Sequence, residues 1–337
     1  MIEGRDSATR IAIFNHKGGV GKTTLTVNIA AALGELGYKV LLVDSDPQCN
    51  LTSYLIEDSL VTDLLNESDS KDGQTIWSAV KPLVEATGRP KRIEPIRLNQ
   101  RNLSLLPGDI RLSEFEGELN SRWADCMQRA IKGFAGTSGL SEMINDLAND
   151  QRAHFVFYDC GPNIGPLNRA IILDCDYFIV PAACDVFSAR AMFTLGHSLR
   201  TWLTSWQMIM KFAPDDIYLL PGKPRMLGYI PQRFRLYGGQ LAQAHADYLS
   251  VVEERLETEV IEILRSLDKK LAPVTAKKSR LGEIKDYGTL VPRSQLEGVA
   301  IWNVSGSSVT QKNQAYAAFR QIGRRIVERV DASWKDE

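Results

Sequence analysis

Short apolar runs alternate with amphipathic stretches along most of this chain. Runs rich in β-branched and other apolar residues occupy 10–14, 38–43, 102–107, 154–158, 177–181 and 227–231. Between most of them, apolar residues recur every three or four positions, as they do on one face of a helix. Strands that alternate with helices predict an α/β fold with a doubly wound, mainly parallel sheet flanked by helices.

The helical periodicity predicts individual elements as well. We expect helices at 25–36, 75–86, 112–134, 140–149, 167–173, 188–210, 239–270 and 311–330, with a turn at 136–139. In the last of these helices, apolar residues from Tyr316 to Val330 share one face. Trp202 and Trp206 stand four residues apart, which is typical of packing against a core or an interface.

A glycine-rich segment, Phe-Asn-His-Lys-Gly-Gly-Val-Gly-Lys-Thr-Thr at 14–24, joins the first predicted strand to the first helix. This context is typical of a phosphate-binding loop, because backbone N–H groups and the helix dipole face the same anion. Lys22 would reach the β- and γ-phosphates, and the Thr23 hydroxyl would sit on Mg²⁺. The expected ATP-contacting residues of the loop are Lys17, Gly18, Gly19, Val20, Gly21, Lys22, Thr23 and Thr24.

Carboxylates follow two of the predicted strands. Asp44 and Asp46 come directly after the run at 38–43, and Asp159 closes the run at 154–158. In open α/β sheets, ligands bind at the carboxyl ends of the strands. Acidic side chains at that edge suit Mg²⁺ held through water and the orientation of an attacking water molecule.

Three of these motifs resemble a known family. The loop at 17–24 departs from the standard pattern, since His16 stands where its first glycine belongs, and it resembles the deviant Walker A loop of the ParA/MinD ATPases. The stretch at 44–52 resembles the family's D-x-D-P-Q-x-N-x-T signature. The run at 158–165 resembles the switch segment D-x-x-P-S-x-G, but Asn163 replaces the serine, so a hydroxyl contact is not carried over.

The resemblance implies roles for single residues. Lys17 would reach the partner subunit's ATP in a nucleotide sandwich dimer, and Asp46 would position the hydrolytic water. Asp44 would lie nearer the metal, and Asp159 would hold Mg²⁺ through water. Residues 290–294 and 299–302 resemble a late I-P-R segment and a following strand of the family, which makes Pro292 a candidate adenine contact.

Composition narrows the class of protein. The 337 residues are 44% hydrophobic and 24% charged, with a net charge of −1, as in soluble globular proteins. No apolar run or leader indicates a membrane span or a secretion signal. The five cysteines form no C-x-x-C pair, so we expect reduced thiols in the cytoplasm and no iron–sulfur cluster. We expect one ATPase domain at 8–335, with insertions at about 56–100 and 200–290.

The charge is distributed unevenly between the halves. Residues 200–337 hold 21 Lys and Arg against 16 Asp and Glu. A mildly basic half is compatible with a polyanionic partner. The candidate DNA contacts are Arg233, Arg235, Lys277, Lys278, Arg280, Arg320, Arg324 and Arg325. Three interpretations of the segment 232–238 remain open: contact with nucleic acid, a loop over the nucleotide and a plain surface. For the basic cluster at 89–101, a solvated surface is the favoured interpretation.

Together these features favour an ATP-dependent homodimer closest to the ParA/Soj-type partition ATPases. We expect it to bind DNA without sequence preference, to be released by hydrolysis and to be stimulated by a ParB-like or other adaptor protein. No sequence-specific DNA-binding domain is expected before the loop. It would be nucleoid-associated if DNA binding holds. Two alternatives stay open: a MinD-like membrane-positioning ATPase, and an ATPase subunit of a larger defence, conjugation or positioning complex.

Overall fold

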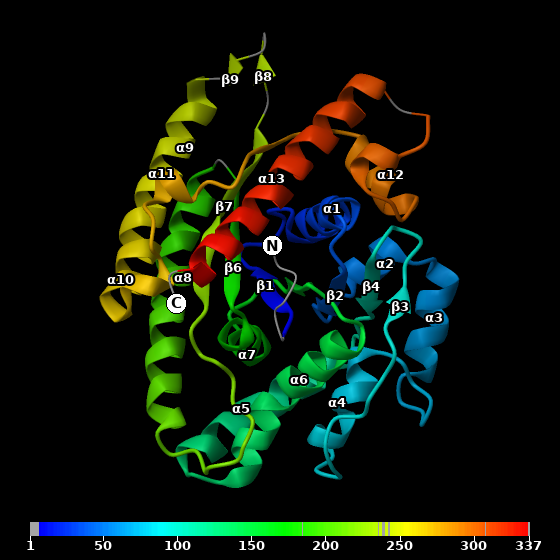
Figure 1. Ribbon diagram of the computed structural model, residues 1–337, viewed down its shortest axis with the longest axis vertical. Coiled ribbons are helices and arrows are strands. Elements are labelled where there is room, and N and C mark those ends of the chain that lie inside the picture. Colours follow the sequence, from blue (N-terminus) through cyan, green and yellow to red (C-terminus); the bar gives the residue numbers. More distant parts are fainter. Residues whose placement is uncertain are drawn as a thin grey trace.

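A computed structural model describes residues 7–183, 185–234, 236–237, 240–241, 243–306 and 308–335. Eight strands form one sheet in the order β10-β7-β6-β1-β5-β2-β4-β3, with helices on both faces (Figure 1). Strand β3 runs antiparallel to β4, and the other paired strands of this sheet are parallel. The doubly wound, mainly parallel fold that the sequence predicts is therefore confirmed.

The strands of the sheet are β1 (Thr9–Ile13), β2 (Val40–Ser45), β3 (Ile96–Arg97), β4 (Leu103–Leu106), β5 (Phe155–Cys160), β6 (Tyr177–Ala183), β7 (Arg225–Phe234) and β10 (Ile284–Lys285). A separate two-stranded ribbon pairs β8 (Leu236–Tyr237) with β9 (Gln240–Leu241). The segments at 56–100 and 200–290 thus both contribute strands to the main sheet. Whether they are insertions stays a prediction.

The helices before β6 are α1 (Lys22–Glu35), α2 (Asn50–Leu55), α3 (Asp58–Glu67), α4 (Ile76–Val84), α5 (Leu112–Met127), α6 (Ile131–Asp150) and α7 (Pro166–Asp174). After β6 come α8 (Val186–Met210), α9 (Gln243–Leu256), α10 (Glu262–Leu267), α11 (Ala276–Ser279), α12 (Leu290–Leu296) and α13 (Val309–Lys335). A π-helical turn, Glu257–Ile261, joins α9 to α10. Single 3₁₀ turns lie at Lys269–Leu271 and Ile301–Asn303.

Alternate side chains along the central strand β1 belong to two separate hydrophobic cores. Ala12 and Phe14 pack with α4 to α9 on one face, whereas Ile11 and Ile13 pack with α1, α2 and α13 on the other. Helix α13 lies along α1 (Figure 1), and its predicted apolar face, including Phe319 and Ile326, is buried. A strand between two covered faces is apolar throughout, which explains the continuous runs in the sequence.

The predicted turn at 136–139 is wrong. The chain instead breaks at 128–130, where Arg129 has a φ of 62°, and the glycines lie inside α6. They permit close helix packing: a Cβ at Gly136 would lie 2.7 Å from the Arg122 side chain, and one at Gly139 would lie 2.7 Å from Leu83. These glycines therefore mark contacts between helices and do not end a helix.

The predicted strand at 299–302 is also wrong. This segment forms a 3₁₀ turn that docks on α1, because the Ile301 N–H donates to Asn28 Oδ1 at 2.8 Å and the Trp302 indole donates to Glu35 at 2.9 Å. The preceding segment forms the helix α12. Within the described residues, no helix is both long enough and apolar enough to cross a bilayer.

Candidate nucleotide-binding site

The glycine-rich loop lies at the carboxyl end of β1, the strand between β5 and β6. Gly19 and Gly21 adopt left-handed backbone angles, with φ of 69° and 77°. Gly21 has a second constraint, since a Cβ there would lie 2.6 Å from Gln232 Oε1. A side chain at Gly21 would therefore be strained by its backbone and would collide with the end of β7.

Side chains around the loop fix its shape. The Asn15 amide donates to Pro181 O at 2.8 Å, and its oxygen accepts the Lys17 N–H at 3.0 Å. The Gln232 amide donates to Val20 O at 2.5 Å. Lys22 is buried, its Nζ lies 3.3 Å from Lys17 O, and burial lowers its pKa despite the nearby carboxylates. The loop is thus held in one conformation with Lys22 folded over it.

Lys17 is bound within its own chain. Its ammonium lies 2.6 and 2.5 Å from the two carboxylate oxygens of Asp185 and 3.1 Å from Ser188 Oγ. Asp185 also caps α8, accepting the Ser188 N–H at 2.7 Å. Burial alone would raise the pKa of Asp185, but the hydrogen bonds from Lys17 and Ser188 lower it. Sequence patterns gave no indication of this ion pair.

Asp159 and Asp44 lie opposite each other on β5 and β2. Asp159 accepts hydrogen bonds from Thr23 at 2.7 Å and from Thr26 at 3.1 Å. Asp44 accepts the N–H of Thr52 at 2.8 Å and its hydroxyl at 2.6 Å. Burial, together with the repulsion from Asp159, raises the pKa of Asp44 to about 7, and burial raises that of Asp159 to about 6.

The donor atoms at this place fit Mg²⁺. Thr23, Asp159 and Asp44, the three residues that the sequence proposes around the metal, offer hydroxyl and carboxylate oxygens, the atoms that Mg²⁺ prefers. The described residues contain no group of three or more His, Cys, Asp or Glu side chains arranged to hold a metal. Mg²⁺ bound with a nucleotide needs one or two carboxylates, because phosphate oxygens and water complete its shell.

Asp46 lies at the edge of the same site. This residue is 6% exposed, and its carboxylate accepts the Gln48 N–H at 3.0 Å. A Cβ built at Gly161 would lie 3.2 Å from Asp46 Oδ1, so Asp46 borders the segment that follows Asp159. Cys160, next to the site, is fully buried, and burial raises its pKa, in keeping with a packing role.

A pocket of about 580 Å³ opens beside the loop. Its lining joins Gly21 and Thr24 to Pro292, Gln232 and Tyr287. The candidate adenine contact thus shares a pocket with the glycine-rich loop. The sequence analysis kept a loop over the nucleotide open for the segment that begins at Gln232, but it assigned no role to Gln232 itself or to Tyr287. Gln232 could have been found, because it lies near the carboxyl end of a predicted strand, where ligands bind in such sheets.

The candidate DNA contacts separate into two groups. Lys277, Lys278 and Arg324 are exposed on α11 and α13, and the described residues give them no side-chain partner. The others are engaged. Arg280 pairs with Glu253 and Glu283, Arg325 donates to Leu281 O, and the Arg320 guanidinium lies 5.6 Å from the Tyr316 ring centroid. Arg235 and the Arg233 side chain lie outside the described parts.

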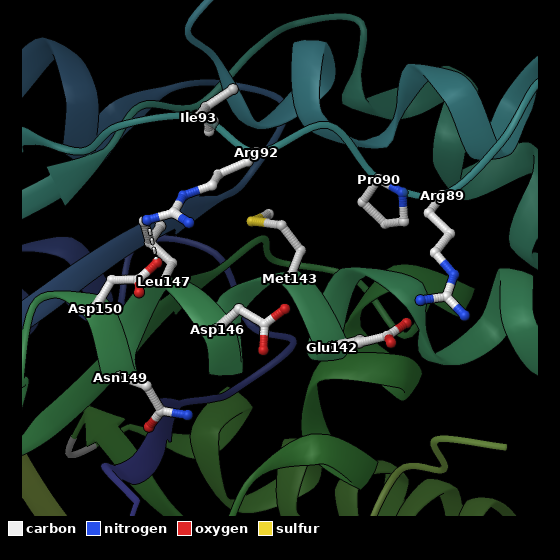
Figure 2. Close-up of a pocket in the computed structure, with 10 residues that line it drawn as sticks. All are labelled: Arg89, Pro90, Arg92, Ile93, Glu142, Met143, Asp146, Leu147, Asn149 and Asp150. Atoms are coloured by element: carbon white, nitrogen blue, oxygen red, sulfur yellow. Dashed lines mark ion pairs between the residues drawn. The ribbon is translucent and has the colours of Figure 1, made fainter. Parts of the chain in front are cut away.

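The arginines near residue 90 face acidic side chains. Figure 2 shows Arg89 and Arg92 beside a pocket whose other wall, on α6, carries Glu142, Asp146 and Asp150. Arg92 and Asp150 form an ion pair of 2.6 Å. A phosphate group would meet three carboxylates here, so this pocket is unsuited to it.

Comparison with known proteins agrees with this geometry. Residues 8–210 match a family model described as an AAA domain. The sporulation initiation inhibitor protein Soj of Bacillus subtilis is 29% identical over 196 residues, which are 56% of this chain and 64% of Soj. The chain spans about half to two thirds of the length of the curated relatives it matches.

Solved structures show the same fold. Protein DIP2308 from Corynebacterium diphtheriae has a TM-score of 0.66 and 25% sequence identity, covering 86% of this chain and 97% of that protein. The septum site-determining protein MinD from Pyrococcus horikoshii, complexed with Mg-ADP, has a TM-score of 0.53 and 18% identity, over 94% of both chains. At that identity, the likeness to MinD concerns the fold alone.

Proposed function

Because this chain belongs to the ParA/MinD family of P-loop ATPases, we propose that it hydrolyses ATP with Mg²⁺ and dimerises in its ATP-bound state. The proposal rests on one observation, that three motifs lie together in the structure. The Thr23 hydroxyl of the loop donates to Asp159 at 2.7 Å. Asp44 lies opposite Asp159 on the neighbouring strand β2, and Asp46 directly follows that strand. Groups of these kinds catalyse phosphoryl transfer, a reaction that depends mostly on positioning and charge stabilisation.

Each residue then has a defined task. Backbone N–H groups at 18–24 bind the phosphate oxygens, and Lys22 contributes a positive charge from a buried position. Thr23, Asp159 and Asp44 would hold Mg²⁺, which when bound would supply positive charge to the phosphate groups. Asp46 orients the attacking water. Pro292 and the other residues of the 580 Å³ pocket surround the adenine.

The proposed dimer forms across the loop. Two aromatic side chains at the start of α8, Phe187 and Phe193, are 70% and 62% exposed, and the Lys17 ammonium lies 5.9 Å from the Phe187 ring centroid. Large apolar side chains exposed in this way commonly mark an interface. A second copy placed there would cover both rings and bring its own Lys17 close to the first subunit's nucleotide.

The exposed cations of α11 and α13 support a role in binding DNA without sequence preference. The Arg329 guanidinium donates to the carbonyls of Lys278 and Ser279 at 2.7 and 2.8 Å, which fixes α11 beside α13. Lys277, Lys278 and Arg324 therefore belong to neighbouring elements. Contacts of this kind neutralise phosphates and make binding depend on salt. Hydrolysis would return the protein to the state that lacks DNA affinity, with an adaptor protein speeding the step.

The proposal is tested by measuring ATP hydrolysis and DNA binding on one preparation. We expect phosphate release that requires Mg²⁺ and is lost in Lys22→Ala, whereas Lys39→Ala, outside the loop, behaves as wild type. DNA of random sequence should be bound with ATP and not with ADP, more weakly as salt rises. Hydrolysis without DNA binding in any nucleotide state would support the ATPase activity but contradict the role in DNA binding, and it would point to a protein partner. No hydrolysis and no nucleotide binding would overturn the proposal.

A further inference from the structure

The segment 161–165, which joins β5 to α7, is bordered by carboxylates on two sides. On one side lies Asp46, as described above. On the other side, a Cβ built at Gly165 would lie only 1.8 Å from Glu116 Oε1. Glu116 comes from α5, about fifty residues earlier in the chain, and the sequence analysis assigned it no role. Its carboxylate fills the space above Gly165.

Glu116 also lies at the start of α7. The residue at the N-cap position of that helix is Gly165, which has no side chain to cap it. Burial raises the pKa of Glu116, and the charge of Asp46 raises it further, while the nearby backbone N–H of Leu167, in the first turn of α7, lowers it. A carboxylate at a helix N-terminus satisfies free N–H groups and is favoured by the helix dipole.

Helix α5 is itself firmly held. Trp123, two turns beyond Glu116, stacks on Trp206 of α8 with 5.4 Å between ring centroids. The Arg169 guanidinium of α7 lies 3.8 Å from the Trp123 ring centroid. Helix α5 therefore contacts α7 at two points, Glu116 and Trp123, and it also contacts α8. These contacts keep the backbone of Glu116 close to Gly165.

We propose that Glu116 is a positioning residue for ATP hydrolysis, which holds 161–165 against Asp46 by occupying the space beside Gly165 at the start of α7. The inference rests on the proposed ATPase function. The segment must meet the γ-phosphate while Asp46 orients water, and holding it in place beforehand lowers the entropic cost of reaching that geometry. Glu116 acts through the backbone of α7, so an uncharged acceptor of the same shape should serve nearly as well.

The first experiment compares kcat and KM for Mg-ATP among Glu116→Ala, Glu116→Gln and Glu114→Ala. Glu114 lies on the same helix and pairs with Arg111, so its variant controls for loss of a carboxylate. We expect Glu116→Ala to lower kcat about tenfold with KM within about twofold, and Glu116→Gln to keep more than half of the wild-type kcat. Unchanged kcat in Glu116→Ala, or equal loss in both Glu116 variants, would overturn the inference.

The second experiment tests the contact itself. Gly165 has φ of −83° and ψ of 172°, an extended conformation that alanine adopts readily before proline. The main obstacle to a side chain is thus Glu116, although Asn163 Oδ1 also lies 2.9 Å from the Cβ position. Gly165→Ala should lower Tm, and adding Glu116→Ala should restore at least half of that loss. Simply additive losses in the double variant would contradict the contact.

A third measurement separates this inference from the proposed function. Amide hydrogen exchange at 163–168 is followed with and without Mg²⁺ and a non-hydrolysable ATP analogue. Protection by the analogue is expected in wild type and Glu116→Gln and is expected to be much weaker in Glu116→Ala. If wild type hydrolyses no ATP, the proposed function fails, yet this result still decides whether Glu116 positions the segment. Equal protection in all three proteins would overturn it.

Discussion

Lys17 and Asp185 form an ion pair within a single chain, with the lysine Nζ 2.6 and 2.5 Å from the two carboxylate oxygens. The proposed dimer needs this lysine to leave its own subunit and reach the other nucleotide. In the proposed dimer, the pair would therefore oppose dimerisation, and its strength would affect how much ATP is needed. The side chains are 22% and 42% exposed, so solvent weakens the pair to the range of surface ion pairs, about 0.2–1 kcal/mol.

Replacing Asp185 with asparagine should favour the dimer. The asparagine oxygen still caps α8, but the attraction for Lys17 is lost. We expect half-maximal dimer formation, measured by light scattering, at about two- to fivefold less ATP. A need for more ATP than wild type would contradict this role of the pair.

The effect of Asp185→Asn on dimer formation has a pH dependence that follows from the lowered pKa of Asp185. A depressed carboxylate pKa contributes stability above the unfolded value of about 4 and loses it as pH falls through the folded value. Between pH 5 and 8 the Asp185 carboxylate is therefore fully ionised. The difference between wild type and Asp185→Asn should therefore stay constant over this window, and a steep change near pH 6 would assign it to another group.

Gly21→Ala should lower the free energy of unfolding by more than the strain of the left-handed backbone alone would. Gly37 is a matched control, because its φ is 98° and nothing lies within 4 Å of the Cβ position, whereas a Cβ at Gly21 meets Gln232 at 2.6 Å. Gly37→Ala should cost about 1–2 kcal/mol of unfolding free energy from the left-handed backbone. Gly21→Ala should cost more and also weaken ATP binding in a calorimetric titration. Equal costs with intact ATP binding would remove Gln232 from the account.

Asp159→Asn should impair the use of magnesium. The amide removes one negative charge, while its oxygen still accepts a hydrogen bond from Thr23 or Thr26. We expect the rate of ATP hydrolysis to fall about 10–100-fold and the Mg²⁺ needed for half-maximal rate to rise. Thr26→Val, which removes one hydrogen bond to Asp159 and leaves the charge, is the control and should have a smaller effect. A wild-type magnesium dependence in Asp159→Asn would exclude it from the metal site.

Lys277→Ala combined with Lys278→Ala should weaken DNA binding alike for all sequences. Each lysine that contacts a phosphate steepens the salt dependence, so the slope of log K against log salt should fall by about one per lysine lost. Lys223→Ala controls for a lost surface cation elsewhere. An unchanged slope in the double variant would move the DNA contact away from α11.

The sequence alone predicts those site residues that belong to short motifs, in which the relevant residues stand close together along the chain. A loop between a strand and a helix, and carboxylates at strand ends, predict the position of Lys22, Thr23, Asp44 and Asp159, because parallel strands bring their carboxyl ends together. Asp185 and Glu116 could not be found this way. Their partners are 168 and about 50 residues distant, and such pairings follow from packing, which leaves no short-range pattern.

The same limit explains the errors in the fold. Gly136 and Gly139 predict a turn, yet they allow α6 to pack closely on Arg122 and Leu83. The segment at 299–302 has strand-like residues, but hydrogen bonds that it donates to Asn28 and Glu35 hold it on α1. In both places, tertiary contacts outweigh local preference.

The central claim is that ATP acts as a dimerisation switch, and Asp46→Ala tests it most directly. Without the residue that orients water, ATP should bind and persist. Light scattering of this variant should give twice the 37.6 kDa of the chain with Mg-ATP, and one chain mass with ADP or without nucleotide. A variant that binds ATP yet stays at one chain mass in all three conditions would contradict the account.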